Sequence, residues 1–530
     1  MPSQTPALQM AREYCLPHRR RRVLTASLIA AIGLSGVPGI SVAVVPISRC
    51  GDMAGKGYTL RTGIAAAQEG DTIDLNALPL TCSTITLTGG EIPIPRANLT
   101  ISGAIGRTVT VSGNNVGRVF YHSGGGTLTL TGFEVAYGST VGNGGCIYSN
   151  GGPTLSGMIV SHCHATNGGG LYSRSALQAT HVTDSTIVAN TANGGGAGIW
   201  QSGGALYAND DVVTGNVAGG SGGGIYNAGG LSMTQVSVTD NQSGNRGGGI
   251  FDRNGIALGS PLPIYLAGLV IDHNTAAHEG GGVFSSNDVK LTLSLVSNNT
   301  AGNSAGGGGL AIDASYAFVI GSTIAGNTAN GTGAQGGGIK ATLLGAFNPK
   351  LSVINSTISG NSAWDGSGIF GNTSPAGYFF MYNSTVAFDR GYLNGASVHV
   401  VACQATLHSS ILARSTDFDA AAARPDLQFD SYCSDTTAVL GAHNLIMSSP
   451  NTLPGDTVAN DPNLAPLALR GSALPTHALP ANSIAVDGGD NPLNLPYDER
   501  GGTRKIAAAP DIGAYERQVS DDELFYGGFD

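Results

Sequence analysis

GGGIY at residues 222–226 is one of nine copies of a short phrase that recurs between Gly144 and Phe370. The other copies are GGCIY (144–148), GGGLY (168–172), GAGIW (196–200), GGGIF (247–251), GGGVF (280–284), GGGGL (306–310), GGGIK (336–340) and GSGIF (366–370). Their aliphatic anchors, 24 to 33 residues apart, are Ile147, Leu171, Ile199, Ile225, Ile250, Val283, Leu310, Ile339 and Ile369. A second phrase, close to STIxxNTA, contributes Asn190, Asn216, Asn241, Asn274, Asn299, Asn327 and Asn361. Two phrases locked to one period indicate a single structural unit repeated many times.

The segments between the glycine clusters predict β-strands. Runs such as LSMTQVSVTD (231–240) and KLTLSLVSNN (290–299) alternate apolar and polar residues without a period of 3.6. Units of this length, with turns of Gly, Asn and Ser, are typical of the coils of a parallel β-helix. We therefore predict an all-β, single-stranded, right-handed parallel β-helix, because parallel crossovers are nearly always right-handed. Glycines would form its φ > 0 corners, and the recurring asparagines would adopt left-handed turns and hydrogen-bond along a ladder.

The composition supports a folded protein and argues against several partners. The chain has 530 residues, of which 82 are glycine, with 41% hydrophobic residues, 11% charged residues and a net charge of −10. This hydrophobic content is sufficient for a core. An acidic chain without clusters of Lys and Arg beyond its amino terminus is unsuited to nucleic acid or to an anionic membrane surface.

The chain divides into five parts. Residues 1–43 read as a signal peptide, because Arg19–Arg22 precede an apolar segment and the small residues Ser41-Val42-Ala43. Residues 44–140 would form an N-terminal cap with a short helix and the first coils, and residues 141–450 carry the repeats. Residues 451–517 predict a loop-rich C-terminal cap, followed by a tail at 518–530. We expect an extracellular, cell-surface or outer-membrane location after cleavage, without a transmembrane segment in the mature chain.

Six cysteines remain after the predicted cleavage: Cys50, Cys82, Cys146, Cys163, Cys403 and Cys433. An even number in an exported chain predicts disulfides. Sequence order suggests the local pairing Cys50–Cys82, Cys146–Cys163 and Cys403–Cys433, which is one of several possible pairings. Because none of them has CxxC spacing, we expect no metal site and no cofactor.

An aromatic residue directly follows the aliphatic anchor in six successive repeats: Tyr148, Tyr172, Trp200, Tyr226, Phe251 and Phe284. Ala311 and Lys340 interrupt this series, and Phe370 resumes it. If the anchors point inward, strand alternation turns the aromatic residues outward into a stacked column. Such a column would bind sugar rings or a protein partner. The alternative is that the rings fill the core or lie beneath a neighbouring loop.

The sequence identifies no catalytic residues. Val270-Ile271-Asp272-His273 is similar to the IDH element of pectate lyases, but it stands where other repeats carry STIVAN or STIAGN. Asn209-Asp210-Asp211 offers adjacent carboxylates without the partner motifs of polygalacturonase-type hydrolases. His162, His164 and His181 lie close in sequence, but their spacing does not predict a metal. We favour a non-catalytic exported protein for surface attachment or for recognition of glycans or partners, with a polysaccharide lyase or glycoside hydrolase as the alternative.

Both ends of the mature chain resemble bacterial protein families. Cys50–Tyr137, with TLRTGIAAAQEGDTIDL, CSTITLTGGEI and GRVFYHSGGGTLTLTG, is similar to the start of exported β-helix proteins related to the polymorphic outer-membrane protein repeats. Asp461–Glu516, with LRGSALPTHALPANSIAVDGGD, DERGGTRKI and DIGAYE, resembles the choice-of-anchor Q C-terminal region. The resemblance implies a surface or extracellular β-helix from a group without an agreed activity. The family often has another anchoring element, whereas this sequence continues only to LFYGGFD.

Overall fold

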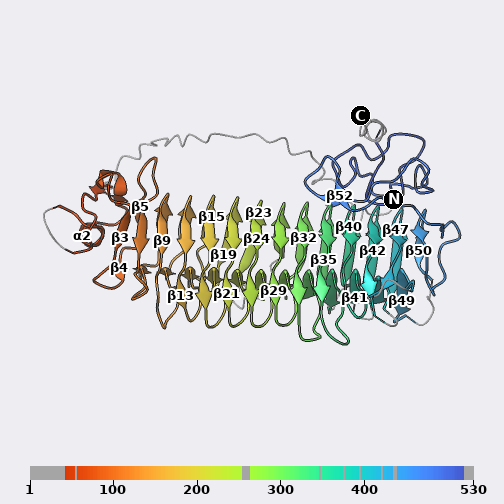
Figure 1. Ribbon diagram of the computed structural model, residues 1–530, viewed down its shortest axis with the longest axis horizontal. Helices are drawn as coiled ribbons and strands as arrows, with labels where there is room; N and C mark the ends of the chain where they lie inside the picture. Colours follow the sequence, from red (N-terminus) through yellow and green to blue (C-terminus); the bar gives the residue numbers. More distant parts are fainter. Residues whose placement is uncertain are drawn as a thin grey trace.

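The structure, a computed structural model, describes residues 42–53, 57–253, 263–344, 348–373, 376–392, 395–418, 422–433 and 438–518. This part of the chain forms a long rod of stacked coils, with helix α2 (Leu60–Ala66) at one end (Figure 1). Residues 1–41 of the predicted signal peptide and 519–530 of the predicted tail lie outside the described residues. Within the described residues, no helix has the length and apolarity needed to span a bilayer.

Each coil of the rod adds strands to parallel sheets that we call A, B, C and D, and a coil visits them in the order C, A, B, D. Sheet A contains β1 (Val44–Pro46), β2 (Thr72–Asp74), β5 (Leu99–Ser102), β8 (Leu128–Thr131), β11 (Thr154–Ser156), β15 (Thr180–Thr183), β19 (Ala205–Asn209), β23 (Gly230–Thr234), β27 (Ile264–Ala267), β31 (Val289–Thr292), β35 (Tyr316–Ile320), β39 (Lys350–Ile354), β42 (Tyr378–Tyr382), β46 (Gln404–His408) and β50 (Leu440–Ala442). Sheet B contains β3 (Thr84–Thr86), β6 (Thr110–Ser112), β9 (Glu134–Ala136), β12 (Ile159–Ser161), β16 (Thr186–Val188), β20 (Val212–Thr214), β24 (Ser237–Thr239), β28 (Val270–Asp272), β32 (Leu295–Ser297), β36 (Thr323–Ala325), β40 (Thr357–Ser359), β43 (Thr385–Ala387), β47 (Ile411–Ala413) and β51 (Leu445–Ile446).

Sheet C, which carries the predicted aromatic column, contains β4 (Ile92–Ile94), β7 (Phe120–His122), β10 (Ile147–Ser149), β14 (Leu171–Ser173), β18 (Ile199–Gln201), β22 (Ile225–Asn227), β26 (Ile250–Asp252), β30 (Val283–Ser285), β34 (Leu310–Ala314), β38 (Ile339–Leu343), β41 (Ile369–Thr373), β45 (Val398–Ala402) and β49 (Leu427–Ser431). Sheet D contains β13 (His164–Ala165), β17 (Thr191–Ala192), β21 (Val217–Ala218), β25 (Gln242–Ser243), β29 (Thr275–Ala276), β33 (Thr300–Ala301) and β37 (Thr328–Ala329), and continues as the pair β44 (Arg390–Gly391) and β48 (Thr416–Asp417). A short η1 (Leu75–Ala77) and the antiparallel pair β52 (Ala468–Leu469) and β53 (Pro475–Thr476) complete the described elements. The predicted all-β parallel β-helix is therefore confirmed.

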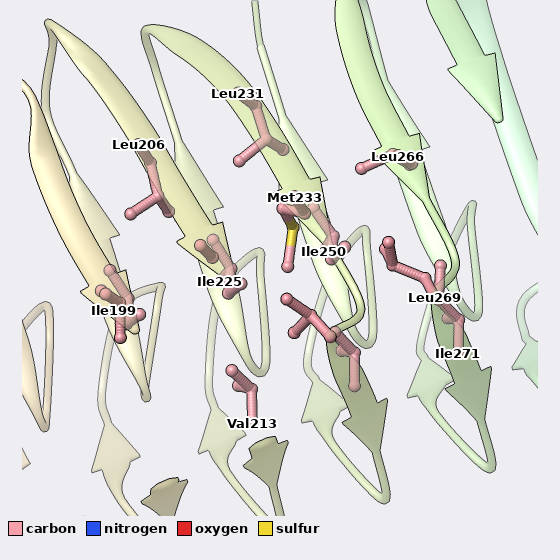
Figure 2. Close-up of a cluster of buried hydrophobic side chains, with 14 of the residues drawn as sticks. Ile199, Leu206, Val213, Ile225, Leu231, Met233, Ile250, Leu266, Leu269 and Ile271 are labelled. Atoms are coloured by element: carbon pink, nitrogen blue, oxygen red, sulfur yellow. The ribbon is translucent and has the colours of Figure 1, made fainter. Parts of the chain in front are cut away.

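The nine aliphatic anchors lie in register on sheet C and point into the rod. Each is at most 1% exposed, and each faces its counterpart in the next coil, as Ile225 faces Ile250. Figure 2 shows how side chains from three sheets meet in this interior: Ile199, Ile225 and Ile250 from sheet C, Leu206, Leu231 and Leu266 from sheet A, and Val213 and Ile271 from sheet B. Burial of these stacked side chains is the main stabilising contribution.

The recurring asparagines form a buried ladder at the corner between sheets B and D. Asn274, which is fully buried, accepts from the backbone N–H and the side-chain Nδ2 of Asn241, each at 3.0 Å. Its own Nδ2 donates to the carbonyl oxygen of Val238 at 2.8 Å and to Oδ1 of Asn299 at 2.9 Å. The left-handed backbone belongs to the preceding residue, such as His273 with φ 53°. The prediction that these asparagines themselves adopt it is wrong, because they must turn their side chains inward to build the ladder.

The asparagine ladder is terminated by a disulfide at its start and by an aspartate at its end. At its start, the backbone N–H of Cys163 donates to Asn190 Oδ1, and the Cys146–Cys163 disulfide occupies the positions that Gly170 and Asn190 hold in the next coil. At its end, Asp389 Oδ1 accepts from the backbone N–H and the Nδ2 of Asn361. Burial raises the pKa of Asp389 to about 7. A carboxyl group suits this place, because its Oδ1 accepts from Asn361 and no asparagine of the next coil continues the ladder.

A second ladder, which the sequence did not predict, follows the corner between sheets A and B. Ser294, Ser322, Ser356 and Ser384 each accept a backbone N–H from the preceding coil and donate to a carbonyl oxygen two residues earlier. The repeated serine of the STI phrase is therefore a corner residue. Both ladders satisfy buried backbone groups where the strands are interrupted.

Helix α2 covers the first end of the core, as predicted. Leu60 and Ile64 are buried together with Ala67, and Thr59 with Thr62 forms a capping box at the start of the helix. Arg61 pairs with Asp52 at 2.9 Å.

All three local disulfides suggested by sequence order are present: Cys50–Cys82, Cys146–Cys163 and Cys403–Cys433. The first and the last of them lie near the two ends of the rod.

The loop-rich C-terminal region lies along the side of the rod, beside β40 and β47 (Figure 1). Its residues Leu479, Ile512 and Tyr515 pack with Ile411 and Leu445 of sheet B. Fully buried Glu499 accepts from Thr323 Oγ1 at 3.0 Å and from the backbone N–H of Thr357 at 3.1 Å, and it also contacts Thr357 Oγ1. At the second end of the core, Leu453 packs against the interior cluster. The region from about residue 463 is thus a cover for the flank of the last coils.

Candidate functional site

The predicted aromatic column exists on the outer face of sheet C. Strand alternation turns the residue after each anchor outward, and Tyr121 of β7 extends the series by one ring. Ring centroids of successive members lie 5.1, 5.3, 6.1, 3.6, 5.0 and 5.2 Å apart along the series Tyr121, Tyr148, Tyr172, Trp200, Tyr226, Phe251 and Phe284. The interplanar angles are 29° or less. The rings therefore stack face to face along the rod.

Stacking determines which part of each ring reaches the surface. Tyr226 is 8% exposed and Phe284 is 3% exposed, whereas Tyr148, Tyr172, Trp200 and Phe251 are half-buried. Because the faces cover one another, the column presents ring edges and hydroxyl groups. Tyr148 donates to Asn150 Oδ1 at 3.1 Å, and burial raises the pKa of Tyr172, which keeps its hydroxyl protonated. The column is a polar-edged aromatic wall.

Arginines border this wall. The guanidinium of Arg118 lies 5.1 Å from the ring centroid of Tyr121 and 5.4 Å from that of Tyr148. Arg253 donates to the hydroxyl of Tyr226 at 3.0 Å. At the far end, the guanidinium of Arg246 lies 4.9 Å from the centroid of Phe284. Cation–π contacts of this kind stabilise the wall and place donors beside it.

A row of three charged side chains, Lys340, Glu279 and Arg246, lies where Ala311 interrupts the column. Lys340 follows Ala311 in register, and its Nζ reaches back to Oε1 of Glu279 at 2.7 Å and to the carbonyl oxygen of Ala305 at 3.0 Å. The other oxygen of Glu279 lies 3.0 Å from Nε of Arg246. Glu279 is therefore held between two cations, and the Lys340 and Glu279 side chains are only 15% and 13% exposed.

Beside these charged side chains lies a groove of about 400 Å³. It is lined by Glu279, Ser286, Asp288, Asp313, Ala314, Ser315, Lys340, Thr342 and Leu344. Asp313 is an exposed residue of this lining. Its carboxylate nevertheless loses part of its water, and this loss together with the charge of Glu279 raises its pKa. Asp288 Oδ1 accepts from the backbone N–H groups of Ser315 and Tyr316 at 3.0 and 2.8 Å. Three carboxylates, of Glu279, Asp288 and Asp313, and the ammonium group of Lys340 thus line one groove. A pair of carboxylates is what acid–base chemistry on a sugar uses.

Sequence reasoning missed this groove, although one signal was available. Ala311 and Lys340 are the two positions that break the aromatic series, and Lys340 is the cation of the groove. A break in an otherwise regular column indicates a position at which the residue has a role other than stacking on its neighbours. Glu279 and Asp313 gave no periodic signal of their own.

The other candidates from the sequence have structural roles. Asp272 accepts from Ser297 Oγ at 2.6 Å and from Asn298 Nδ2 at 2.9 Å, and His273 occupies a left-handed corner beside it. Asp211 is buried and accepts the backbone N–H of Ser185, and burial raises its pKa to about 7. His162, His164 and His181 are dispersed between a corner, sheet D and sheet A. In the part of the chain that the structure describes, no three His, Cys, Asp or Glu side chains form a metal-binding group.

No family model matches the chain, and none of the curated proteins has a similar sequence. The backbone is similar to a crystal structure of pectate lyase Pel9A with a TM-score of 0.33 and 13% sequence identity, over 91% of this chain and 98% of that chain.

Proposed function

We propose that this protein is an exported, non-catalytic β-helical rod that recognises glycans, or a partner at the cell surface, through the aromatic wall of sheet C. The observation that carries the proposal is the column of seven stacked rings from Tyr121 to Phe284. A wall with aromatic edges, hydroxyl groups and arginines suits ligands that combine apolar faces with many hydroxyls.

Several further features support an exported protein of this kind. Three disulfides fit an oxidising compartment. The N-terminal segment resembles exported polymorphic outer-membrane-type β-helices, and Asp461–Glu516 resembles the choice-of-anchor Q region. We propose that this region acts at the bacterial surface, and that residues 1–43 direct export.

Removal of three of the four tyrosine hydroxyl groups of the wall is expected to weaken glycan binding by about tenfold while the stack remains. The variant replaces Tyr121, Tyr148 and Tyr172 with phenylalanine. The matched control replaces Tyr207 and Tyr265, which are each 47% exposed on sheet A, in the same way. Binding is measured on a glycan array and then by titration with the best oligosaccharide. Equal affinity of the two variants would reject the wall as the binding surface.

The groove gives a specific reason for a second candidate, a polysaccharide lyase or hydrolase. Glu279, Asp313 and Lys340 converge there, and a carboxyl with a raised pKa, such as that of Asp313, is suited to donate a proton to a leaving oxygen. If the protein has this activity, Asp313→Asn should reduce it by at least about 100-fold.

Activity is measured as release of unsaturated uronides and of reducing ends from polygalacturonate and from neutral polysaccharides. Asp210→Asn serves as the control, because asparagine tolerates the left-handed corner at this position. The absence of both products with every polysaccharide, or an Asp313→Asn variant as active as the wild type, removes this candidate.

A further inference from the structure

A second, separate group of aromatic rings lies at the opposite end of the rod from Tyr121. Trp364, Tyr392 and Phe418 occupy equivalent positions of three successive coils, two residues after the paired positions Ser362, Arg390 and Thr416. We call these three rings the corner stripe. The ring centroids of Trp364 and Tyr392 are 4.1 Å apart at an angle of 28°, and those of Tyr392 and Phe418 are 5.8 Å apart at 52°.

The fold does not require aromatic residues at these positions. In the seven coils of sheet D, the corresponding residues are Thr166, Asn193, Gly219, Gly244, Ala277, Gly302 and Asn330. Those coils form the same corner with small or polar side chains. The corner stripe is therefore an addition to the repeat.

Two of the three rings of the corner stripe are open to solvent, whereas Trp364 is half-buried like most rings of the sheet C wall. Tyr392 is 39% exposed and Phe418 is 44% exposed, whereas Tyr226 and Phe284 in the wall are 8% and 3% exposed. The tilt between Tyr392 and Phe418 also leaves their faces incompletely covered. Adjacent exposed aromatic rings on a rigid surface are typical of a binding site.

Charged side chains adjoin the corner stripe and restrict what can bind there. Asp365, directly after Trp364, lies 2.6 Å through Oδ2 from Nδ1 of His399, and Asp430 Oδ2 lies 2.9 Å from Nε2 of the same ring. Burial disfavours the charged imidazole, but the two carboxylates outweigh it and raise the pKa of His399. Asp417, next to Phe418, pairs with Arg424 at 3.5 Å. A carboxylate thus directly follows Trp364 and directly precedes Phe418 in the chain.

We propose that the corner stripe is a second carbohydrate-binding site, in which sugar rings lie on Tyr392 and Phe418 and their hydroxyls donate to the neighbouring carboxylates. An apolar protein surface would fit less well, because it would remove water from these charged side chains without replacing the lost hydrogen bonds. A sugar supplies both an apolar C–H face for the rings and hydroxyl donors for the carboxylates. This inference rests on the proposed function for the class of ligand, but not on the sheet C wall.

The positions of the two tryptophans make the two sites separately observable. The chain has 2 tryptophans, with Trp200 in the wall and Trp364 in the corner stripe. The variant Trp200→Phe retains only the reporter of the stripe, and Trp364→Phe retains only the reporter of the wall. Each full-length variant is titrated with cellohexaose, chitohexaose and hexagalacturonate while tryptophan emission is recorded.

We expect a saturable change of Trp364 emission in Trp200→Phe with at least one of these oligosaccharides. In that background, Tyr392→Ala and Phe418→Ala should each weaken binding by about tenfold, Phe418→Tyr should retain it, and Tyr207→Ala should have no effect. Melting curves establish that the variants are folded. Because Tyr392 and Phe418 lie in different coils, one variant still tests the site if the other does not fold.

The outcomes separate this inference from the proposed function. A response of Trp200 alone would retain the wall and overturn the corner stripe. A response of Trp364 alone would support the stripe and contradict binding at the wall. If none of the three oligosaccharides changes Trp364 emission, or if both alanine variants bind as tightly as Trp200→Phe, the corner stripe is not a carbohydrate site.

Discussion

Asn274→Ala is expected to lower the free energy of unfolding by about 3–5 kcal/mol. The replacement removes the side-chain oxygen that accepts from the backbone N–H and from the Nδ2 of Asn241, at 3.0 Å each. It also removes the donor to the carbonyl oxygen of Val238. All these groups are buried, so water cannot replace the lost partner without opening the coil.

Urea unfolding of the full chain, followed by circular dichroism, measures this effect. The matched control is Asn245→Ala, because Asn245 lies one coil from Asn274 and is exposed. We expect the control to change stability by less than about 0.5 kcal/mol. If both variants unfold at the same urea concentration, the asparagine ladder does not hold the coils together.

Stability is expected to fall as the pH rises from 4.5 to about 8, because of Glu499. Complete burial raises the pKa of this carboxyl from its ordinary 4.5 to about 8, although hydrogen bonds from Thr357 and Thr323 act in the opposite direction. The folded protein therefore binds the proton more tightly than the unfolded chain. Its contribution is complete below pH 4.5 and is lost as the pH rises through about 8. The expected loss is on the order of 5 kcal/mol.

The test compares wild type with Glu499→Gln, a neutral side chain of the same shape, in thermal melts between pH 5 and pH 9. Other groups also change stability with pH. Burial lowers the pKa of His477 to about 4, so this residue stabilises the folded protein at neutral pH and loses that contribution in acid, opposite to Glu499. The difference between the two melting curves isolates Glu499. We expect Glu499→Gln to match wild type at pH 5 and to be more stable at pH 9. Parallel curves would show that Glu499 is already charged in the folded protein.

The repeat was sufficient to predict the fold, because each coil carries the residues that determine its own conformation. An aliphatic anchor, a polar corner residue and glycines recur at one period, so each coil forms its contacts with the next in the same way. The sequence also predicted helix α2, and the local cysteine pairing that it suggested among several is the one present. Both depend on short separations along the chain. It misplaced the left-handed corners by one residue, because periodicity does not distinguish the inward-pointing asparagine from its neighbour.

The candidate sites could be predicted only in part. The aromatic series was visible, but its ring-to-ring stacking and the resulting exposure of edges depend on the twist and register of sheet C. Trp364, Tyr392 and Phe418 gave no signal, because the phrases around them are less regular. Their common column becomes visible only through the pairing of sheet D.

By itself, the sequence determined the β-helix and its interior, since these follow from a short phrase repeated at constant phase. It left open whether the aromatic rings point outward. The tertiary structure alone decided that Glu279, Asp313 and Lys340 share one groove, and that Glu499 is buried against Thr323 and Thr357 on the flank of the rod. These residues belong to different coils or to an aperiodic region. Their meeting depends on how coils of unequal length stack and how loops return to them, which no local pattern encodes.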